Sequence, residues 1–143
     1  MDTAKAGQAK AFGKIKELGA TDILITKESN KTFFTFKAPN GKRYKFTTRS
    51  KKSKTWQTSI TYGKECPANQ NESEFWVFVD ITNEQGAFYI VPLFWVKNDI
   101  YIVHKEYLKK HGGHRPFNEN SIHHSIAVKR IEKWKDEWRL MGF

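Results

Sequence analysis

The sequence predicts a single α+β domain over residues 1–143, with an N-terminal helix, a mixed sheet of five to six strands that includes a basic β-hairpin, and C-terminal helices. A length of 143 residues is that of one ordinary domain. The chain can build a core, because it contains 11 Phe, 5 Tyr and 5 Trp. Apolar residues recur at helical spacing near both ends, and strand-like alternation lies between them.

The N-terminal segment is expected to form a helix over residues 3–18. Ala11, Ile15 and Leu18 fall at helical spacing there, and a glycine follows as a C-cap. Residues 21–27 (TDILITK) have the composition of a strand.

Residues 31–49 are expected to form a β-hairpin. The apolar run within residues 31–38 predicts its first strand, and an Asn-Gly pair signals the turn that follows. Residues 42–49 alternate, which predicts a second strand with two different faces. One face would receive Tyr44, Phe46 and Thr48, and the other would receive Lys45, Thr47 and Arg49. The hairpin would then carry its charges on one face and at its tip.

The second half of the chain begins with a polar connection over residues 50–73, in which the sequence does not place an element. Residues 74–82 (EFWVFVDIT) are nearly apolar throughout, which predicts a strand in the interior of the sheet. A turn and a strand over 87–91 follow, and Pro92 ends that strand because it cannot donate to the ladder.

The C-terminal third is predicted to contain one more strand and two helices. Residues 99–103 (DIYIV) have strand composition, and residues 104–110 are expected to begin a helix that Gly112-Gly113 breaks. A closing helix is expected over residues 121–141, because its apolar residues recur at helical spacing. That stripe consists of Ala127, Ile131, Trp134, Trp138 and Met141.

The excess positive charge lies in one quarter of the chain. The net charge is +10, and no acidic residue occurs between Glu28 and Glu65. That window holds ten basic residues, and the remainder of the chain is neutral. One basic segment on a neutral body is typical of an anion-binding face. The ten are Lys31, Lys37, Lys42, Arg43, Lys45, Arg49, Lys51, Lys52, Lys54 and Lys64.

Several function classes are disfavoured by composition. No stretch approaches the roughly 20 apolar residues of a membrane-spanning helix, so we expect no membrane partner. The first residues lack the apolar core of a secretion signal, and a single cysteine, Cys66, allows no internal disulfide. A cytoplasmic location is the expectation that follows.

The order of these segments resembles that of the PD-(D/E)XK nuclease-like superfamily, the restriction-endonuclease-like fold. PNGKRYKFTTRSKKSKTW (39–56) is similar to the hairpin and motif strand of small members, and EFWVFVDITNEQGAFYIVP (74–92) is similar to their next two strands. KRIEKWKDEWRLMGF (129–143) resembles their closing helix. The resemblance implies a restriction-endonuclease-like domain that acts on nucleic acid, most simply DNA.

The catalytic motif implied by that resemblance is degenerate here. The family places an acidic residue or Gln two positions before a Lys, and carboxylates hold Mg²⁺, which lowers the pKa of a bound water. Thr47 stands at the first of these positions and Arg49 at the second. Asp22, Glu28 and Glu17 are the nearby carboxylates that could act as displaced ligands. We therefore expect no metal site and no cofactor, with Mg²⁺ needed in the alternative in which cleavage is retained.

Other chemistry has less support in the sequence. His111 and His114 with His123 could suggest zinc, yet the first two straddle Gly112-Gly113 and lack a second cysteine or an acidic cluster. Nothing places a histidine beside Cys66 to make a thiol nucleophile.

The sequence therefore predicts a nucleic-acid-binding protein with a nuclease-like fold that does not cleave. An active Mg²⁺-dependent DNA endonuclease with displaced ligands is one alternative, and a basic module or inhibitor that docks on an acidic protein is another. A homodimer also stays open. Trp56 could stack on a base or could anchor the basic loop to the core. The predicted nucleic-acid contacts are Lys42, Arg43, Lys45, Arg49, Lys51, Lys52, Lys54 and Trp56.

Overall fold

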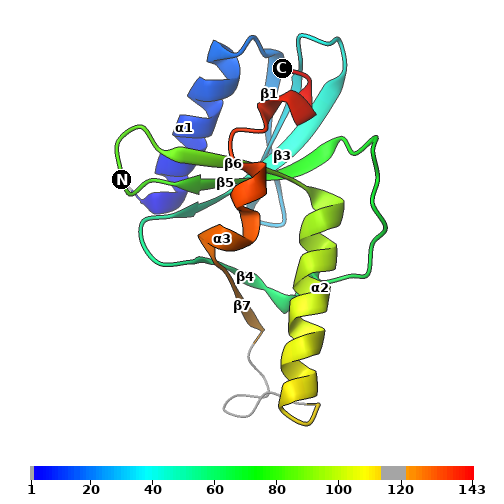
Figure 1. Cartoon of the computed structure of the whole chain (residues 1–143). Coiled ribbons are helices and arrows are strands. Elements are labelled where there is room, and N and C mark those ends of the chain that lie inside the picture. Colours follow the sequence, from blue (N-terminus) through cyan, green and yellow to red (C-terminus); the bar gives the residue numbers. More distant parts are fainter. Residues whose placement is uncertain (1, 114–121) are drawn as a thin grey trace.

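The structure, a computed structural model, describes residues 2–113 and 122–143 and confirms the α+β class. An N-terminal helix, a mixed five-stranded sheet, a small two-stranded sheet and helices towards the C-terminus make up the chain (Figure 1). No helix in the described ranges is long and apolar enough to cross a membrane.

The first half of the chain contains α1 (Thr3–Glu17), β1 (Thr21–Glu28), β2 (Lys31–Lys37), β3 (Arg43–Lys51), β4 (Trp56–Ser59) and the 3₁₀ turn η1 (Ile60–Tyr62). The second half contains β5 (Glu74–Asp80), β6 (Ala87–Pro92), α2 (Leu93–Lys110), β7 (His123–Ile126), α3 (Val128–Ile131), η2 (Glu132–Trp134) and η3 (Trp138–Met141).

The main sheet has the strand order β1-β2-β3-β5-β6. The first three strands form an antiparallel meander, β3 pairs in parallel with β5, and β5 pairs antiparallel with β6. The predicted hairpin is confirmed as β2 and β3, and Gly41 has the positive φ of 86° that its turn requires. β4 and β7 pair in a separate sheet.

The sheet separates two hydrophobic cores. On one face, α1 packs through Ala11 and Ile15 against residues such as Phe46. On the other face, α2 packs through Val96 and Ile100 over β5 and β6. α2 extends beyond the sheet and lies beside β4 and β7, which share its core (Figure 1). α2 covers β5 and β6 on this second face, and we call its β1-β2-β3 part the open face. Arg43 is exposed there and Lys45 is half-buried, whereas Thr47 and Lys51 are buried where η1 and β4 approach β3.

The predicted strand over residues 99–103 is wrong, because this segment is the middle of α2. The helix runs without a break from Leu93 to Lys110. Its buried residues, Val96, Asp99 and Ile100, fall three and four apart, which is the spacing of one helix face. The β-branched composition of DIYIV was therefore overridden by packing on the sheet.

The predicted closing helix over residues 121–141 is also wrong. The described part of this segment contains β7, the short helix α3 and two 3₁₀ turns. Ile131 packs into the core on the α2 side, whereas Trp138 and Met141 pack into the core on the α1 side. The chain passes the edge of β6 between them, where Lys135 bridges Tyr89. One straight helix cannot supply both faces of a sheet.

Candidate anion-binding site

The register of the β2–β3 hairpin sorts the basic side chains by face. Lys37 is paired with Arg43, and Thr35 is paired with Lys45. Paired residues in an antiparallel ladder point to the same face, so the odd-numbered residues of both strands share the open face. The predicted alternation in residues 42–49 agrees with this, because Phe46 packs on the α1 side.

Two residues beyond the last paired position of this hairpin, Lys31 and Arg49 line one cavity of about 180 Å³, which we call the inner cavity. Its floor is the sheet, and its walls come from η1 and from the first turns of α2. The lining residues are Lys31, Phe33, Thr47, Arg49, Tyr62, Glu74, Trp76, Leu93 and Lys97.

Arg49 is held in the inner cavity by aromatic rings. Its guanidinium carbon lies 4.4 Å from the centroid of Trp76 and 5.6 Å from that of Tyr62. One terminal nitrogen donates to the Tyr62 hydroxyl at 3.4 Å, and Nε is buried with no hydrogen-bond partner among the described residues. Burial lowers the pKa of Arg49, although the group remains a cation at neutral pH. An oriented, incompletely hydrogen-bonded guanidinium is a ready donor to an anion.

Lys31 brings a second cation to the same place. Its Nζ lies 3.8 Å from the Tyr62 ring centroid. Desolvation and the charge of Arg49 both lower the pKa of Lys31. Within residues 2–113 and 122–143, neither Lys31 nor Arg49 forms an ion pair with a carboxylate. Two like charges that meet in this way are stabilised by an anion between them.

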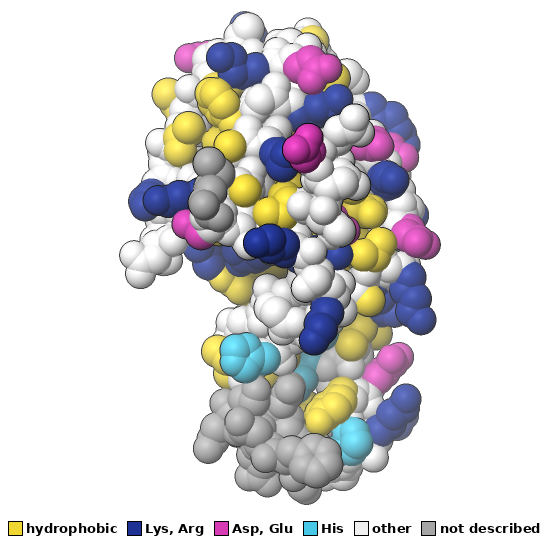
Figure 2. Space-filling view, turned by 90° about the vertical axis from the view of Figure 1, so that its left-hand side faces the viewer, with side chains coloured by type: hydrophobic (Ala, Val, Ile, Leu, Met, Phe, Trp, Pro, Cys, Tyr) yellow, Lys and Arg dark blue, Asp and Glu magenta, His cyan; other side chains and the backbone are white. Residues whose placement is uncertain are grey.

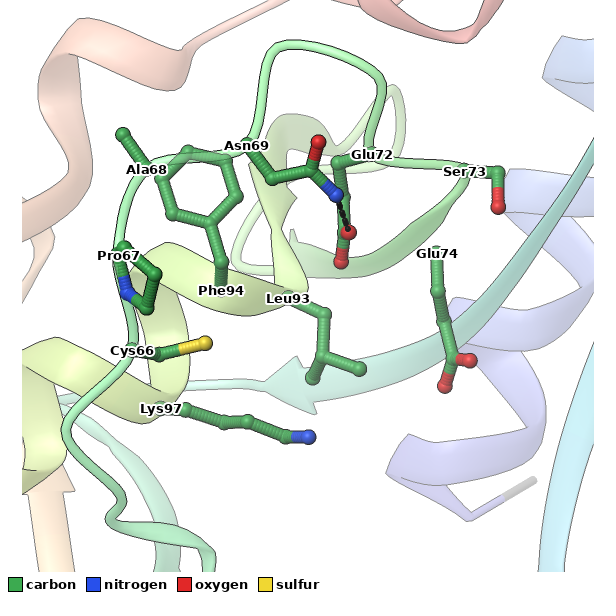
Figure 3. A pocket seen from close by; sticks show the side chains of 10 residues that line it. All are labelled: Cys66, Pro67, Ala68, Asn69, Glu72, Ser73, Glu74, Leu93, Phe94 and Lys97. Carbon is green, nitrogen blue, oxygen red and sulfur yellow. Dashed lines mark hydrogen bonds between the residues drawn. The ribbon is translucent and has the colours of Figure 1, made fainter.

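An outer cavity of about 610 Å³ adjoins the inner one and shares Glu74, Leu93 and Lys97 with it. Figure 3 shows Cys66 and Lys97 extending into the space between the 66–74 segment and α2. The other residues that line this space are Pro67, Ala68, Asn69, Glu72, Ser73 and Phe94.

Glu72 has a structural role at this outer cavity. It accepts a hydrogen bond from Asn69 at 3.2 Å and another from the backbone N–H of Phe94, in the first turn of α2. A carboxylate there satisfies an orphan donor and complements the helix dipole. Desolvation nevertheless raises the pKa of Glu72, with a smaller contribution from the charge of Glu74.

The predicted nucleic-acid contacts fall into three groups. Lys42, Lys52 and Lys54 are exposed in the turns at the two ends of β3. Arg43 pairs with Asp22 at 2.9 Å, and Lys45 pairs with Glu28 at 2.9 Å. Both of these pairs are exposed to water, where an ion pair contributes about 0–1 kcal/mol, so a phosphate could compete for either cation.

The third group, Lys51 and Trp56, is built into the core. Lys51 is 7% exposed and pairs with Asp80 at 2.9 Å. Trp56 is 1% exposed and donates from Nε1 to the carbonyl of Val79 at 3.1 Å. No indole face remains for a base, so the structure favours the anchoring role of Trp56. Lys51 and Trp56 are outside the interface that we propose below.

The candidate metal ligands do not converge on Arg49. Asp22 and Glu28 each face a different cation, and Glu17 lies 3.9 Å from Lys14 on α1. Thr47 donates its hydroxyl proton to the carbonyl of Thr32 at 2.8 Å. Among the residues lining the inner cavity, Glu74 is the carboxylate. No group of three or more His, Cys, Asp and Glu in the described ranges is arranged to hold a metal ion.

The histidines and Cys66 lie elsewhere. His111 caps the end of α2, with its ring 4.5 Å from that of Tyr107. His123 begins β7, and His114 lies outside the described residues. Cys66 is half-buried, and its backbone N–H donates to Asn98 at 3.1 Å.

Seven residues of the inner cavity were missed by the site predicted from the sequence, and Glu74 and Leu93 are among them. Lys31 and Phe33 could have been found by extending the strand alternation along the hairpin register to Arg49. Tyr62, Trp76 and Lys97 carry no such signal, because η1, β5 and α2 meet Arg49 through tertiary packing.

Positive charge is not gathered into one block on the face drawn in Figure 2. Lys and Arg side chains are spread over that face, and Asp and Glu lie among them. Within the described residues, three of the ten basic residues of the 29–64 window pair with carboxylates from outside it, namely Arg43, Lys45 and Lys51. The inner cavity is thus a more specific feature than the charge excess itself.

Comparisons with protein-family models, with curated proteins and with solved structures give no match for this chain.

Proposed function

We propose that this protein binds the phosphate backbone of nucleic acid, most simply DNA, on the open β1-β2-β3 face and does not cleave it. The observation that carries the proposal is the meeting of Lys31 and Arg49 in one cavity, where neither forms an ion pair with a carboxylate of the described residues. A phosphate oxygen accepts hydrogen bonds from both groups and neutralises their mutual repulsion.

The basic residues along β3 support a contact that extends over several phosphates. Nine residues at about 3.3 Å each make β3 about 30 Å long. Lys42 precedes the strand and Lys52 follows it, while Arg43, Lys45 and Arg49 share the open face between them. A nucleic-acid strand laid along β3 would meet about five of these cations.

We propose that the protein does not cleave nucleic acid, because the residues at two positions of the nuclease-like motif differ from those that the motif requires. Thr47 and Arg49 occupy the places where the nuclease-like resemblance implies a metal ligand and a lysine. Arg49 can bind a phosphate through its planar fork without a metal ion. The order of a helix, a three-stranded meander and two further strands is found in the structure, with the short strand β4 inserted, and supports the nuclease-like fold. The closing helix that the resemblance also implied over residues 129–143 is absent from the structure, which has α3 and two 3₁₀ turns there.

The test is a titration of labelled duplex and single-stranded DNA at several salt concentrations, first with EDTA and then with Mg²⁺ or Mn²⁺, with product sizes checked on a gel. About five phosphate contacts predict that log K falls with log salt at a slope of roughly −4 to −5 on duplex DNA. Arg49→Gln should weaken binding and reduce the slope by about 1. Lys110→Gln removes an exposed charge at the far end of α2 and serves as the matched control.

Each outcome of this titration is informative. Salt-dependent binding with intact DNA in both conditions supports the proposal. Metal-dependent cleavage would replace it with the endonuclease alternative and direct mutagenesis to Asp22, Glu28 and Glu74. Absence of binding at low salt would refute nucleic-acid binding altogether.

A second candidate function is docking on an acidic protein, and one observation favours it. Leu24 and Ile25 are 54% and 57% exposed on β1, the strand at one edge of the sheet. An edge strand with exposed apolar side chains can pair with a strand of another chain. A failed DNA titration would make this candidate the leading one.

A further inference from the structure

The inner cavity has a charge that suits a dianion. It is lined by three cationic side chains, Lys31, Arg49 and Lys97, and by one carboxylate, Glu74, which gives a net charge of +2. Glu74 and Lys97 also line the outer cavity, so they stand at the boundary between the two. Lys31 and Arg49 are the two cations that belong to the inner cavity alone.

The cavity is also closed on the side of the sheet. Phe33, Thr47 and Trp76 come from three neighbouring strands, which form a continuous hydrogen-bonded floor. A polynucleotide chain cannot pass through this floor, so an internal phosphodiester would have to enter and leave through the same mouth. A volume of about 180 Å³ is below the roughly 300–1,000 Å³ of pockets for drug-sized ligands. A single phosphate group with part of a sugar fits such a space better than a continuous chain.

Internal and terminal phosphates differ in charge and in acceptors. A backbone phosphodiester carries one negative charge. A phosphomonoester carries about −1.5 to −2 at pH 7 and offers three strong acceptor oxygens. Arg49 and Lys31 both line the cavity, so the guanidinium and the ammonium group supply its donors for these oxygens, although the Nε of Arg49 is itself buried from solvent.

We propose that the inner cavity binds the terminal phosphate of a nucleic-acid strand, with Arg49 and Lys31 as its direct ligands. The inference rests on the proposed function, because the rest of the strand would be held by the basic residues along β3. It adds a preference for phosphorylated ends to what would otherwise be binding along the backbone alone.

The aromatic walls make the two cations effective ligands. Trp76 and Tyr62 flank the guanidinium of Arg49, and the Tyr62 ring also contacts Lys31. Cation–π contacts restrict these long side chains before a ligand arrives, so less conformational entropy is lost on binding. Desolvation and the charge of Arg49 lower the pKa of Lys31, and a bound anion would oppose this by stabilising the ammonium cation.

The experiment compares oligonucleotides of one sequence that differ only in their ends. Short labelled strands, single and duplex, would carry a 5′-phosphate, a 3′-phosphate or hydroxyls, and their affinities would be measured in EDTA by fluorescence anisotropy. We expect a phosphorylated end to bind about ten-fold more tightly than the hydroxyl end, which is the effect of one or two charge-assisted hydrogen bonds. A nucleoside monophosphate added as competitor should displace the phosphorylated strand weakly.

Variants separate the cavity from the rest of the interface. Arg49→Gln and Lys31→Gln should each bring the ratio of the affinities for the phosphorylated and the hydroxyl end towards one. Lys52→Gln, outside the cavity, should weaken both probes equally and leave the preference unchanged. Thermal unfolding of each variant checks its fold, and Lys31→Gln, which removes the ammonium group of a half-buried side chain, serves if Arg49→Gln does not fold.

The outcomes also separate this inference from the proposed function. Equal, salt-dependent affinity for phosphorylated and hydroxyl ends would overturn the terminal-phosphate site and leave nucleic-acid binding intact. Binding of no oligonucleotide would refute the proposed function and the site with it. Displacement by a nucleoside monophosphate at the concentration at which the strand itself binds would overturn the assignment to strand ends, because the phosphate source would then be a free nucleotide.

Discussion

The ion pair between Lys51 and Asp80 offers the sharpest test of which basic residues serve the fold and which serve binding. Lys51 points to the same side of β3 as Arg49 but is buried there, with its Nζ 2.9 Å from the Asp80 carboxylate and 4.9 Å from the Trp56 ring centroid. Asp80 also accepts hydrogen bonds from the backbone N–H and the hydroxyl of Thr82. Asp80→Ala would leave a nearly buried ammonium group without its partner.

The expected loss of folding stability in Asp80→Ala follows from how deeply the two side chains of the pair are buried. The side chains are 7% and 19% exposed for Lys51 and Asp80, respectively. Removing one partner of a buried pair costs about 3–5 kcal/mol. Because Asp80 is partly exposed, water can reach Lys51 after truncation, and we expect the lower end, about 3 kcal/mol. For a domain of this size the melting temperature should then fall by about 10 °C.

The assay is urea unfolding followed by tryptophan fluorescence, with Asp80→Ala, Lys51→Met and the double variant compared in a double-mutant cycle. The double variant should recover part of the loss, because no unpaired charge remains. DNA affinity per folded molecule should change little in Lys51→Met. A loss below 1 kcal/mol in Asp80→Ala, or a reduced salt slope in Lys51→Met, would refute the assignment of Lys51 to the fold.

The same pair predicts a pH dependence. Burial by itself raises the pKa of Asp80, but hydrogen bonds from Thr82 and Lys51 outweigh it and hold the pKa below its usual value. A carboxyl with a depressed pKa contributes stability that is present above its unfolded pKa and is lost as the pH falls through the folded value. The stability gap between the natural chain and Asp80→Asn should therefore narrow as the pH falls below about 4.

Two further substitutions test the packing of the helices. Gly7→Ala should destabilise the fold by about 1–2 kcal/mol, because the new Cβ would overlap the Ser50 hydroxyl and lie 2.8 Å from the Ser50 Cβ. This loss is expected although alanine favours helix more than glycine does. Gly13→Ala, whose new Cβ meets nothing within 4 Å, should be neutral or stabilising in the same thermal melt. Asp99→Ala should cost about 1–2 kcal/mol, because it removes hydrogen bonds of 2.7–3.2 Å from Arg130 that link α2 to α3. If Asp99→Ala costs as much stability in an Arg130→Ala background as in the natural chain, the loss does not come from the hydrogen bonds between Asp99 and Arg130.

Local pattern predicted much of the first half of the fold. α1, β1 and the β2–β3 hairpin follow from helical spacing, strand composition and an Asn-Gly turn, all of which act over a few residues. The apolar run over 74–82 likewise predicted β5, which lies between β3 and β6. Residues 99–103 and 121–141 were predicted wrongly, because their apolar residues serve partners that are distant in sequence.

The site was predictable to a similar extent. The sequence placed Arg49 on the charged face of a hairpin, and the structure places it there. The sequence could not separate Lys51 from Arg49, since both are odd-numbered basic residues of β3. Asp80, on the neighbouring strand, pairs with Lys51, whereas Trp76, four residues earlier, contacts Arg49 through its ring.

The sequence by itself determined the α+β class, the hairpin and the location of the positive charge, because local propensity and charge count are properties of short segments. The tertiary structure decided which cations are available. Side chains from η1, β5 and α2 converge on two residues of the hairpin and form a cavity around Arg49 and Lys31, whereas Asp80 neutralises Lys51. Such contacts depend on the order of strands in the sheet and on the path of α2, which are set by packing between distant segments.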